Sequence, residues 1–130
     1  MTITLERSRR ARILVVDDEL PMAQTLSLAL VCMGHDAAAY ADPHEALEAL
    51  ADGYGHDLVI ADRRMPGVAG DTVARWAKAL RPELPVILMS AERAPADPSP
   101  LVEGVLCEPF SMLDLEVAVN RALGARRRTH

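Results

Sequence analysis

Cysteine, aromatic residues and long apolar runs are all scarce in this sequence. Two cysteines among 130 residues, Cys32 and Cys107, cannot form the disulfide framework of a small secreted protein, and we expect both to be buried. With one Trp, two Tyr and one Phe, the core has to be aliphatic. No apolar run approaches the roughly 18 residues that a membrane span needs, and the N-terminus lacks the apolar stretch of a secretory signal. These absences predict a cytoplasmic protein without a membrane segment. The four histidines show no metal-ligand spacing, so we expect them at the surface.

Lysine is the scarcest charged residue. Lys78 is the single lysine, and the other 13 basic residues are arginines, seven of which lie near the ends of the chain at positions 7, 9, 10, 12 and 126–128. Residues 13–124 hold 7 basic and 18 acidic side chains, a net charge of 7 − 18 = −11. Nucleic acid phosphates are bound by clustered Lys and Arg, so we expect no nucleic acid as the main partner. We interpret 1–10 as a flexible basic extension, 11–124 as one domain and 125–130 as a basic C-terminal tail.

Strand and helix patterns alternate along the chain. Short apolar runs, typical of strands buried on both faces, are separated by capped helical segments. Strands are expected at 12–17, 35–41, 57–61, 85–89 and 105–107, and helices at 20–33, 43–53, 71–81 and from 111 through 123. This alternation predicts a doubly wound α/β domain with a five-stranded parallel sheet.

One connection departs from this alternation. Between Ser90 and Val105, prolines at positions 95, 98 and 100 remove backbone donors and restrict the residues before them. We therefore expect an irregular crossover over 91–104, where the fourth helix of such a fold is irregular or missing.

Polar side chains follow the strands at the edge where open parallel sheets bind ligands. Asp17 and Asp18 follow the first strand, Asp62 the third, Ser90 the fourth and Glu108 the fifth. Converging aspartates repel one another unless a cation is present, and oxygen ligands suit Mg²⁺ or another hard divalent cation. A carboxylate beside such an ion can also act as a nucleophile toward phosphorus. Each acid alone is equally consistent with a helix cap, but the joint pattern favours a cation site.

Four motifs resemble the receiver domain of bacterial two-component response regulators: ILVVDDE at 13–19, DLVIADRRMPG at 57–67, PVILMSA at 85–91 and EPF at 108–110. The resemblance covers roughly residues 11–124 and implies a flavodoxin-like receiver architecture. It implies that Asp62 accepts a phosphoryl group from the phosphohistidine of a sensor histidine kinase or a phosphotransfer protein. It also implies that Ser90 is the switch hydroxyl and that Glu108 and Pro109 are joined by a cis peptide bond. The implied ligands of Mg²⁺ are the side chains of Asp17, Asp18 and Asp62 and the backbone carbonyl of Arg64.

Two positions depart from the family pattern. Relatives carry a lysine at the position of Glu108, so the charge there changes from +1 to −1. At about 4 Å from a phosphoryl group and an effective dielectric near 20, each unit of charge changes the interaction energy with that group by on the order of 4 kcal/mol. Val105 stands where relatives commonly place a switching aromatic residue. Compensation by Arg63, Arg64 or Arg93 and a role of Glu108 as an added cation ligand both remain open.

Two functions remain open as well. In the first, the chain is a stand-alone bacterial receiver, because nothing after residue 124 is long enough for an output domain. It takes a phosphoryl group on Asp62 with Mg²⁺ and is no enzyme beyond gaining and losing that group. In the second, it is a phosphorylation-independent protein-interaction module. An aspartyl-nucleophile phosphatase is disfavoured, because the Asp-x-Asp spacing of the haloacid dehalogenase family is absent at 17–19 and no lysine lies near the site.

Overall fold

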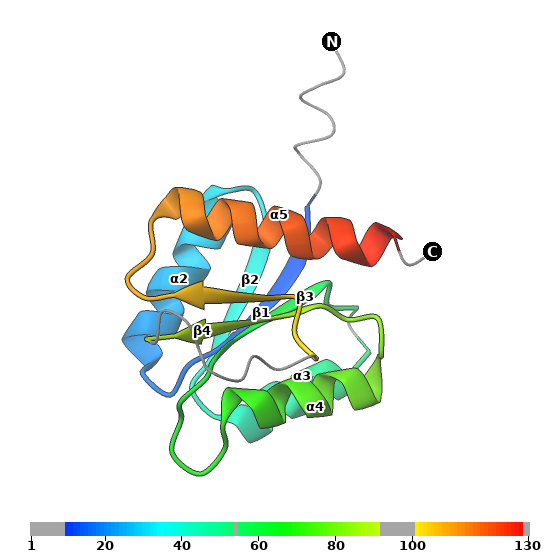
Figure 1. Ribbon diagram of the computed structural model, residues 1–130. Helices are drawn as coiled ribbons and strands as arrows, with labels where there is room; N and C mark the ends of the chain where they lie inside the picture. The colour runs from blue at the N-terminus through cyan, green and yellow to red at the C-terminus, as the bar shows by residue number, and fades with distance from the viewer. Residues whose placement is uncertain (1–9, 54, 92–100, 129–130) are drawn as a thin grey trace.

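The computed structural model describes the backbone of residues 10–53, 55–91 and 101–128, and side chains as far as residue 124. Over these residues five strands alternate with four helices (Figure 1). In chain order they are β1 (Arg12–Val16), α2 (Leu20–Cys32), β2 (Asp36–Tyr40), α3 (Pro43–Ala51), β3 (Leu58–Asp62), α4 (Gly70–Leu80), β4 (Val86–Ser90), β5 (Gly104–Cys107) and α5 (Met112–Arg128).

The strands form one parallel sheet in the order β2-β1-β3-β4-β5. Helices α2 and α5 cover one face, and α3 and α4 cover the other (Figure 1). The predicted doubly wound parallel fold is therefore confirmed. β2 lies on one side of β1 in the sheet, and β3 lies on the other side. The chain therefore winds first in one direction and then in the opposite one, and this reversal falls between β1 and β3. Open sheets of this kind bind ligands at that point, beyond the carboxyl ends of the strands.

Two apolar cores flank the sheet. Side chains alternate along each strand, so Ile13 and Val15 of β1 face α2 and α5, whereas Leu14 and Val16 face α3 and α4. All four are at most 1% exposed. Burying a side chain of this size stabilises the fold by about 1.5–3 kcal/mol. The central strands are thus held from both sides, which fixes the backbone that precedes each acid at the sheet edge.

The helix boundaries follow the signals seen in the sequence. Asp42 caps α3, since its Oδ1 accepts the His44 N–H at 2.9 Å. Ser111 and Asp114 form a reciprocal capping box at the start of α5, with both bonds at 3.0 Å. Gly34 follows α2 with a φ of +99°, in the left-handed region that favours glycine.

The last helix is longer than expected. α5 is the fourth helix in chain order and continues to Arg128, so residues 125–128 of the expected basic C-terminal tail are helical. Gly124 costs about 1 kcal/mol relative to alanine inside a helix, but the alanine and arginines after it are good helix formers. The expected crossover at 91–104 falls largely on residues 92–100, which lie outside the described residues. So does the expected extension at 1–10, apart from Arg10, which pairs with Asp36 at 3.1 Å.

Three expectations about burial are wrong, and a fourth is met only in part, because Cys107 is half-buried. Cys32 is exposed because it lies off the buried face of α2. His35 and His56, expected at the surface, are 9% and 7% exposed. The Nδ1 of His35 accepts the N–H of Ala11 at 3.1 Å, and this bond lets the neutral ring be buried. Among the described helices, none combines the length and apolar character that crossing a membrane requires.

Candidate functional site: an acidic cluster at the carboxyl edge of the sheet

The three predicted aspartates meet at the carboxyl edge of the sheet. Asp17 follows β1 directly, and Asp62 is the last residue of the neighbouring β3. Three carboxylate oxygens, one each from Asp17, Asp18 and Asp62, lie within 4.8 Å of one another. The fold therefore brings together the acids that the sequence assigned to one cation.

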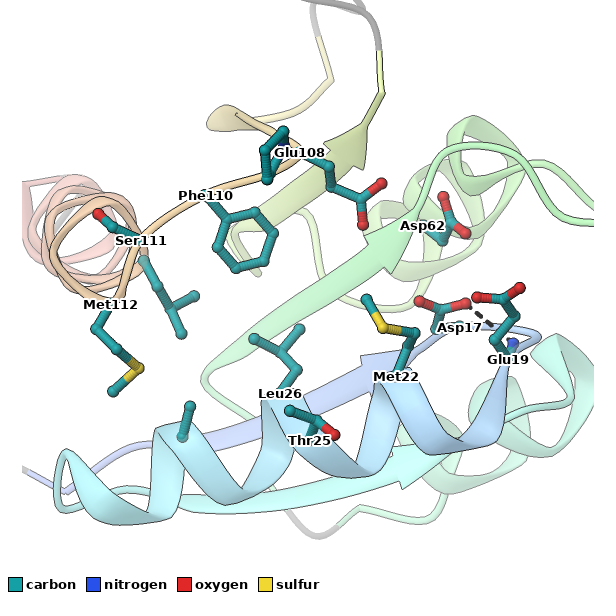
Figure 2. Close-up of a pocket in the computed structure, with 13 residues that line it drawn as sticks. Asp17, Glu19, Met22, Thr25, Leu26, Asp62, Glu108, Phe110, Ser111 and Met112 are labelled. Carbon is teal, nitrogen blue, oxygen red and sulfur yellow. Dashed lines mark hydrogen bonds between the residues drawn. The ribbon is translucent and has the colours of Figure 1, made fainter.

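Asp17 is the buried member of this cluster, with 4% of its surface exposed. Its Oδ1 accepts the N–H of Glu19 at 3.0 Å, a turn that leads into α2 (Figure 2). Burial raises the pKa of Asp17 to about 6, and the negative charges of Asp62, Asp18 and Glu19 add to this, although the Glu19 hydrogen bond opposes it. The carboxylates therefore repel one another in a partly desolvated place, where an added cation relieves the repulsion.

Asp62 is held by the backbone that follows it. The Arg64 N–H donates to Asp62 Oδ1 at 3.2 Å. The Arg63 N–H donates to the Met89 carbonyl at 2.9 Å and so extends the pairing of β3 with β4 by one residue. The loop then returns, and the Gly70 N–H donates to the Arg63 carbonyl at 3.0 Å. These bonds fix the direction in which the Asp62 carboxylate points.

Gly70 is a positioning residue that the sequence analysis missed. A Cβ at this position would overlap the carbonyl oxygen of Asp62, so only glycine lets α4 begin directly against that backbone. The one available signal was a glycine beside Asp71 at the start of the expected helix, since a glycine there can mark a close backbone approach.

The donor set fits Mg²⁺. All three side chains offer carboxylate oxygens, which hard divalent cations prefer. Asp17 is buried, Asp62 is half-buried and Asp18 is exposed, so the cluster is open to solvent on one side. Mg²⁺ keeps several of its waters when it binds through carboxylates, and an open side accommodates them.

The ends of β4 and β5 bring the other predicted residues to the same edge. Ser90 ends β4 and is buried, and its carbonyl accepts the Glu108 N–H at 2.8 Å. The peptide bond between Glu108 and Pro109 is cis, as the resemblance implied. Val105 is half-buried in β5 and lies in register with Leu88. The roles of Ser90 and Val105 in a switch stay predictions.

Glu108 places a further carboxylate beside the acidic cluster, although it is not one of the three acids that lie within 4.8 Å of one another. Its side chain is half-buried, and Figure 2 shows that it points toward Asp62. Burial raises the pKa of Glu108 above its ordinary value, and the charges of Asp62 and Glu19 raise it further. Glu19 was quoted in the first motif but given no role, yet its charge acts on both Asp17 and Glu108.

The arginines considered as substitutes for the family lysine occupy different positions. Arg63 pairs with Asp71 of α4, with 3.5 Å between Nε and Oδ1. Arg64 contributes its backbone N–H to Asp62. Arg93 lies outside the described residues.

A groove of about 590 Å³ extends from the acids along the space between α2 and α5 (Figure 2). Its acidic end is formed by Asp17, Glu19, Asp62 and Glu108. Its remainder is mainly apolar and includes Met22, Leu26, Ala29, Phe110, Met112 and Leu115. This groove could not be predicted from the sequence, because α2 and α5 are far apart in the chain and only tertiary packing brings them together.

An open parallel α/β sheet with clustered acids at its carboxyl edge is the arrangement of a cation-binding α/β domain. Residues 13–104, more than half of the chain, match the family described as the response regulator receiver domain. The chain belongs to this family.

Curated relatives agree with this assignment. The transcriptional regulatory protein TcrA of Mycobacterium tuberculosis is 34% identical over 119 residues, which cover 88% of this chain and 46% of TcrA. The DNA-binding transcriptional regulator NtrC of Azospirillum brasilense is 33% identical over 119 residues, which cover 88% of this chain and 24% of NtrC. The chain thus spans less than half the length of these two relatives.

Solved structures show the same fold. A response regulator receiver domain protein from Clostridium thermocellum superposes with a TM-score of 0.83 at 26% identity, covering 92% of this chain and 99% of that one. The response regulator protein TrrA from Thermotoga maritima, solved in complex with Mg²⁺-BeF, superposes with a TM-score of 0.79 at 30% identity. That match covers 87% of this chain and 99% of TrrA.

Proposed function

We propose that this chain accepts a phosphoryl group on Asp62 from the phosphohistidine of a sensor histidine kinase or a phosphotransfer protein, with Mg²⁺ in the acidic cluster. The observation that carries the proposal is the convergence of Asp17, Asp18 and Asp62 within 4.8 Å. Family membership supports it, as does the Mg²⁺-BeF complex of the related TrrA. Asp17, Asp18, Asp62 and the Arg64 carbonyl would hold the cation.

The transfer needs a correctly aimed carboxylate. An Asp62 oxygen forms a bond to phosphorus while the nitrogen–phosphorus bond of phosphohistidine breaks, and the imidazole leaves and takes up a proton. The Arg64 N–H at 3.2 Å orients Asp62 for this attack. When bound, Mg²⁺ neutralises the negative charge that accumulates between the acids and the phosphoryl oxygens. Ser90, buried at the end of the adjacent β4, is the hydroxyl that we assign to the phosphoryl group in the switched state.

In this proposal the chain catalyses no reaction other than gaining and losing this phosphoryl group. It does so in the bacterial cytoplasm. Its partners are proteins, which the net charge of 7 − 18 = −11 over residues 13–124 supports. The names of the longer relatives describe transcriptional regulation and, for NtrC, DNA binding, and those activities are properties of the relatives.

A second candidate function is a phosphorylation-independent interaction module. Glu108 favours it, because its carboxylate points toward Asp62 where the family resemblance puts a lysine (Figure 2). A negative charge in that place repels an incoming phosphoryl group.

One experiment decides between the two functions. The protein is incubated with Mg²⁺ and acetyl phosphate, and intact mass is recorded for the wild type, for Asp62→Asn and for Asp52→Asn, an exposed aspartate remote from the cluster. Phosphoacceptor function predicts a phosphoryl adduct on the wild type and on Asp52→Asn, and none on Asp62→Asn. Absence of the adduct from the wild type at every Mg²⁺ concentration refutes the proposal and leaves the interaction module.

A further inference from the structure

Glu108 is held in place by the end of the sheet. Its N–H donates to the Ser90 carbonyl at 2.8 Å, which continues the pairing of β4 with β5 beyond Cys107. Its half-buried side chain extends toward Asp62 across the acidic end of the groove (Figure 2). A glutamate is one methylene longer than an aspartate, so its carboxylate can extend farther from the backbone toward the acids of the neighbouring strands.

The acidic end of the groove has no basic side chain among its described lining residues. Asp17, Glu19, Asp62 and Glu108 line it, and Asp18 completes the cluster. The charges of Asp62 and Glu19 act on Glu108 and are of the same sign. Five neighbouring carboxylates of one sign attract cations from solution, and a divalent oxygen-seeking cation matches their chemistry best.

We infer that the negative charge of Glu108, which lies beside the Asp17, Asp18 and Asp62 group, raises the affinity of the acidic cluster for Mg²⁺ before any phosphoryl group is present. The inference rests on the proposed function, because it concerns the same cation site. The cation then supplies positive charge beside Asp62, where the family resemblance puts the ammonium of a lysine. A receiver built in this way responds to Mg²⁺ more strongly than one with a lysine, since the lysine repels the cation that the glutamate attracts.

The test is calorimetric titration of the unphosphorylated protein with MgCl₂ alone. Glu108→Gln removes one charge and is expected to weaken Mg²⁺ binding by about tenfold. Glu108→Lys changes the charge by two and is expected to weaken it by about a hundredfold. Glu48→Gln removes the same charge from an exposed position on α3, at a distance from the site, and should leave the affinity within about twofold of the wild type.

Equal Mg²⁺ affinity of the wild type and Glu108→Gln would overturn the inference. So would an equal loss of affinity in Glu48→Gln, because the effect would then be one of net charge. Thermal unfolding in EDTA checks that each variant is folded. The same samples, incubated with acetyl phosphate at saturating Mg²⁺, report separately on the proposed function. If the wild type and Glu108→Gln differ in Mg²⁺ affinity but no phosphoryl adduct forms, the inference about Glu108 is supported and the phosphoacceptor function is refuted. If an adduct forms but the two Mg²⁺ affinities are equal, the phosphoacceptor function is supported and the inference is refuted.

Discussion

Removing the charge of Asp17 is expected to stabilise the metal-free protein. Asp17→Asn keeps an oxygen that accepts the Glu19 N–H and removes one of the carboxylates that repel each other. The pKa of Asp17 is raised from 3.8 to about 6, mainly by burial and then by neighbouring acids, so folding favours its protonated form. Since one pKa unit corresponds to about 1.4 kcal/mol, ionised Asp17 lowers the free energy of unfolding by about 3 kcal/mol at neutral pH.

The sign of this effect sets its pH dependence. At a pH below the unfolded value near 3.8, the raised carboxyl pKa does not change the free energy of unfolding. As the pH rises from there to about 6, the free energy of unfolding falls progressively, and above about pH 6 the loss stays constant. In urea denaturation with EDTA, Asp17→Asn should therefore gain about 1–3 kcal/mol at about pH 7.5 and at most about 1 kcal/mol at about pH 4.5. Saturating Mg²⁺ should shrink or reverse the difference, because the wild type binds the cation more tightly than the variant.

Glu48→Gln is the matched control, since it removes one charge from an exposed site on α3 and should change stability by less than about 0.5 kcal/mol. The reasoning would be refuted if Asp17→Asn were less stable than the wild type in EDTA near neutral pH. It would also be refuted if the gain were the same at both pH values, because repulsion between ionised groups has to fade as they become protonated.

Three further predictions follow from other contacts. Gly70→Ala should lower the free energy of unfolding by about 1–3 kcal/mol in urea, and it should reduce phosphoryl adduct formation, because the new methyl group displaces the Asp62 backbone. Lys78→Met should lower the free energy of unfolding by up to about 1 kcal/mol in the same assay, because it removes the ammonium that lies 2.7 Å from the Glu103 carboxylate in a partly exposed ion pair. His35→Asn should reduce the loss of stability between about pH 7.5 and 5, because burial lowers the pKa of His35 and its neutral form stabilises the fold only above the unfolded value near 6.5.

Each of these predictions has its own control. Gly124→Ala lies in open space on α5 and should be neutral or stabilising, so equal destabilisation by both glycine variants would contradict the close approach at Gly70. Adding Glu103→Gln to Lys78→Met should recover part of the lost stability, and no recovery would mean that the pair is not coupled. An unchanged pH dependence in His35→Asn would exclude His35 as the titrating group.

The architecture was predictable because its signals are local. The apolar run that forms β1, the cap at Asp42 and the capping box at Ser111 and Asp114 each lie within a few residues of the element that they define. The errors arose where tertiary packing decides burial. His35 looked like a surface residue, but the N–H of Ala11, 24 positions away, satisfies its ring. The helical continuation past residue 124 had no stop signal strong enough to prevent it.

The acidic cluster was predictable in its members, because parallel strands must end at a common edge and the acids follow those ends. The energetics of the acidic cluster could not be predicted from the order of the strands and acids along the chain alone. The raised pKa of Asp17 depends on how deeply the sheet buries it and on the distance to Asp62.

Periodicity, caps and strand ends are encoded along the chain, and they were enough to predict the doubly wound fold, the family and the grouping of Asp17, Asp18 and Asp62 at one edge of the sheet. Three other features could not be predicted in this way: Glu108 points toward Asp62, Gly70 has no room for a side chain, and an apolar groove opens between α2 and α5. Those features are distances between segments far apart in sequence, and packing alone sets such distances.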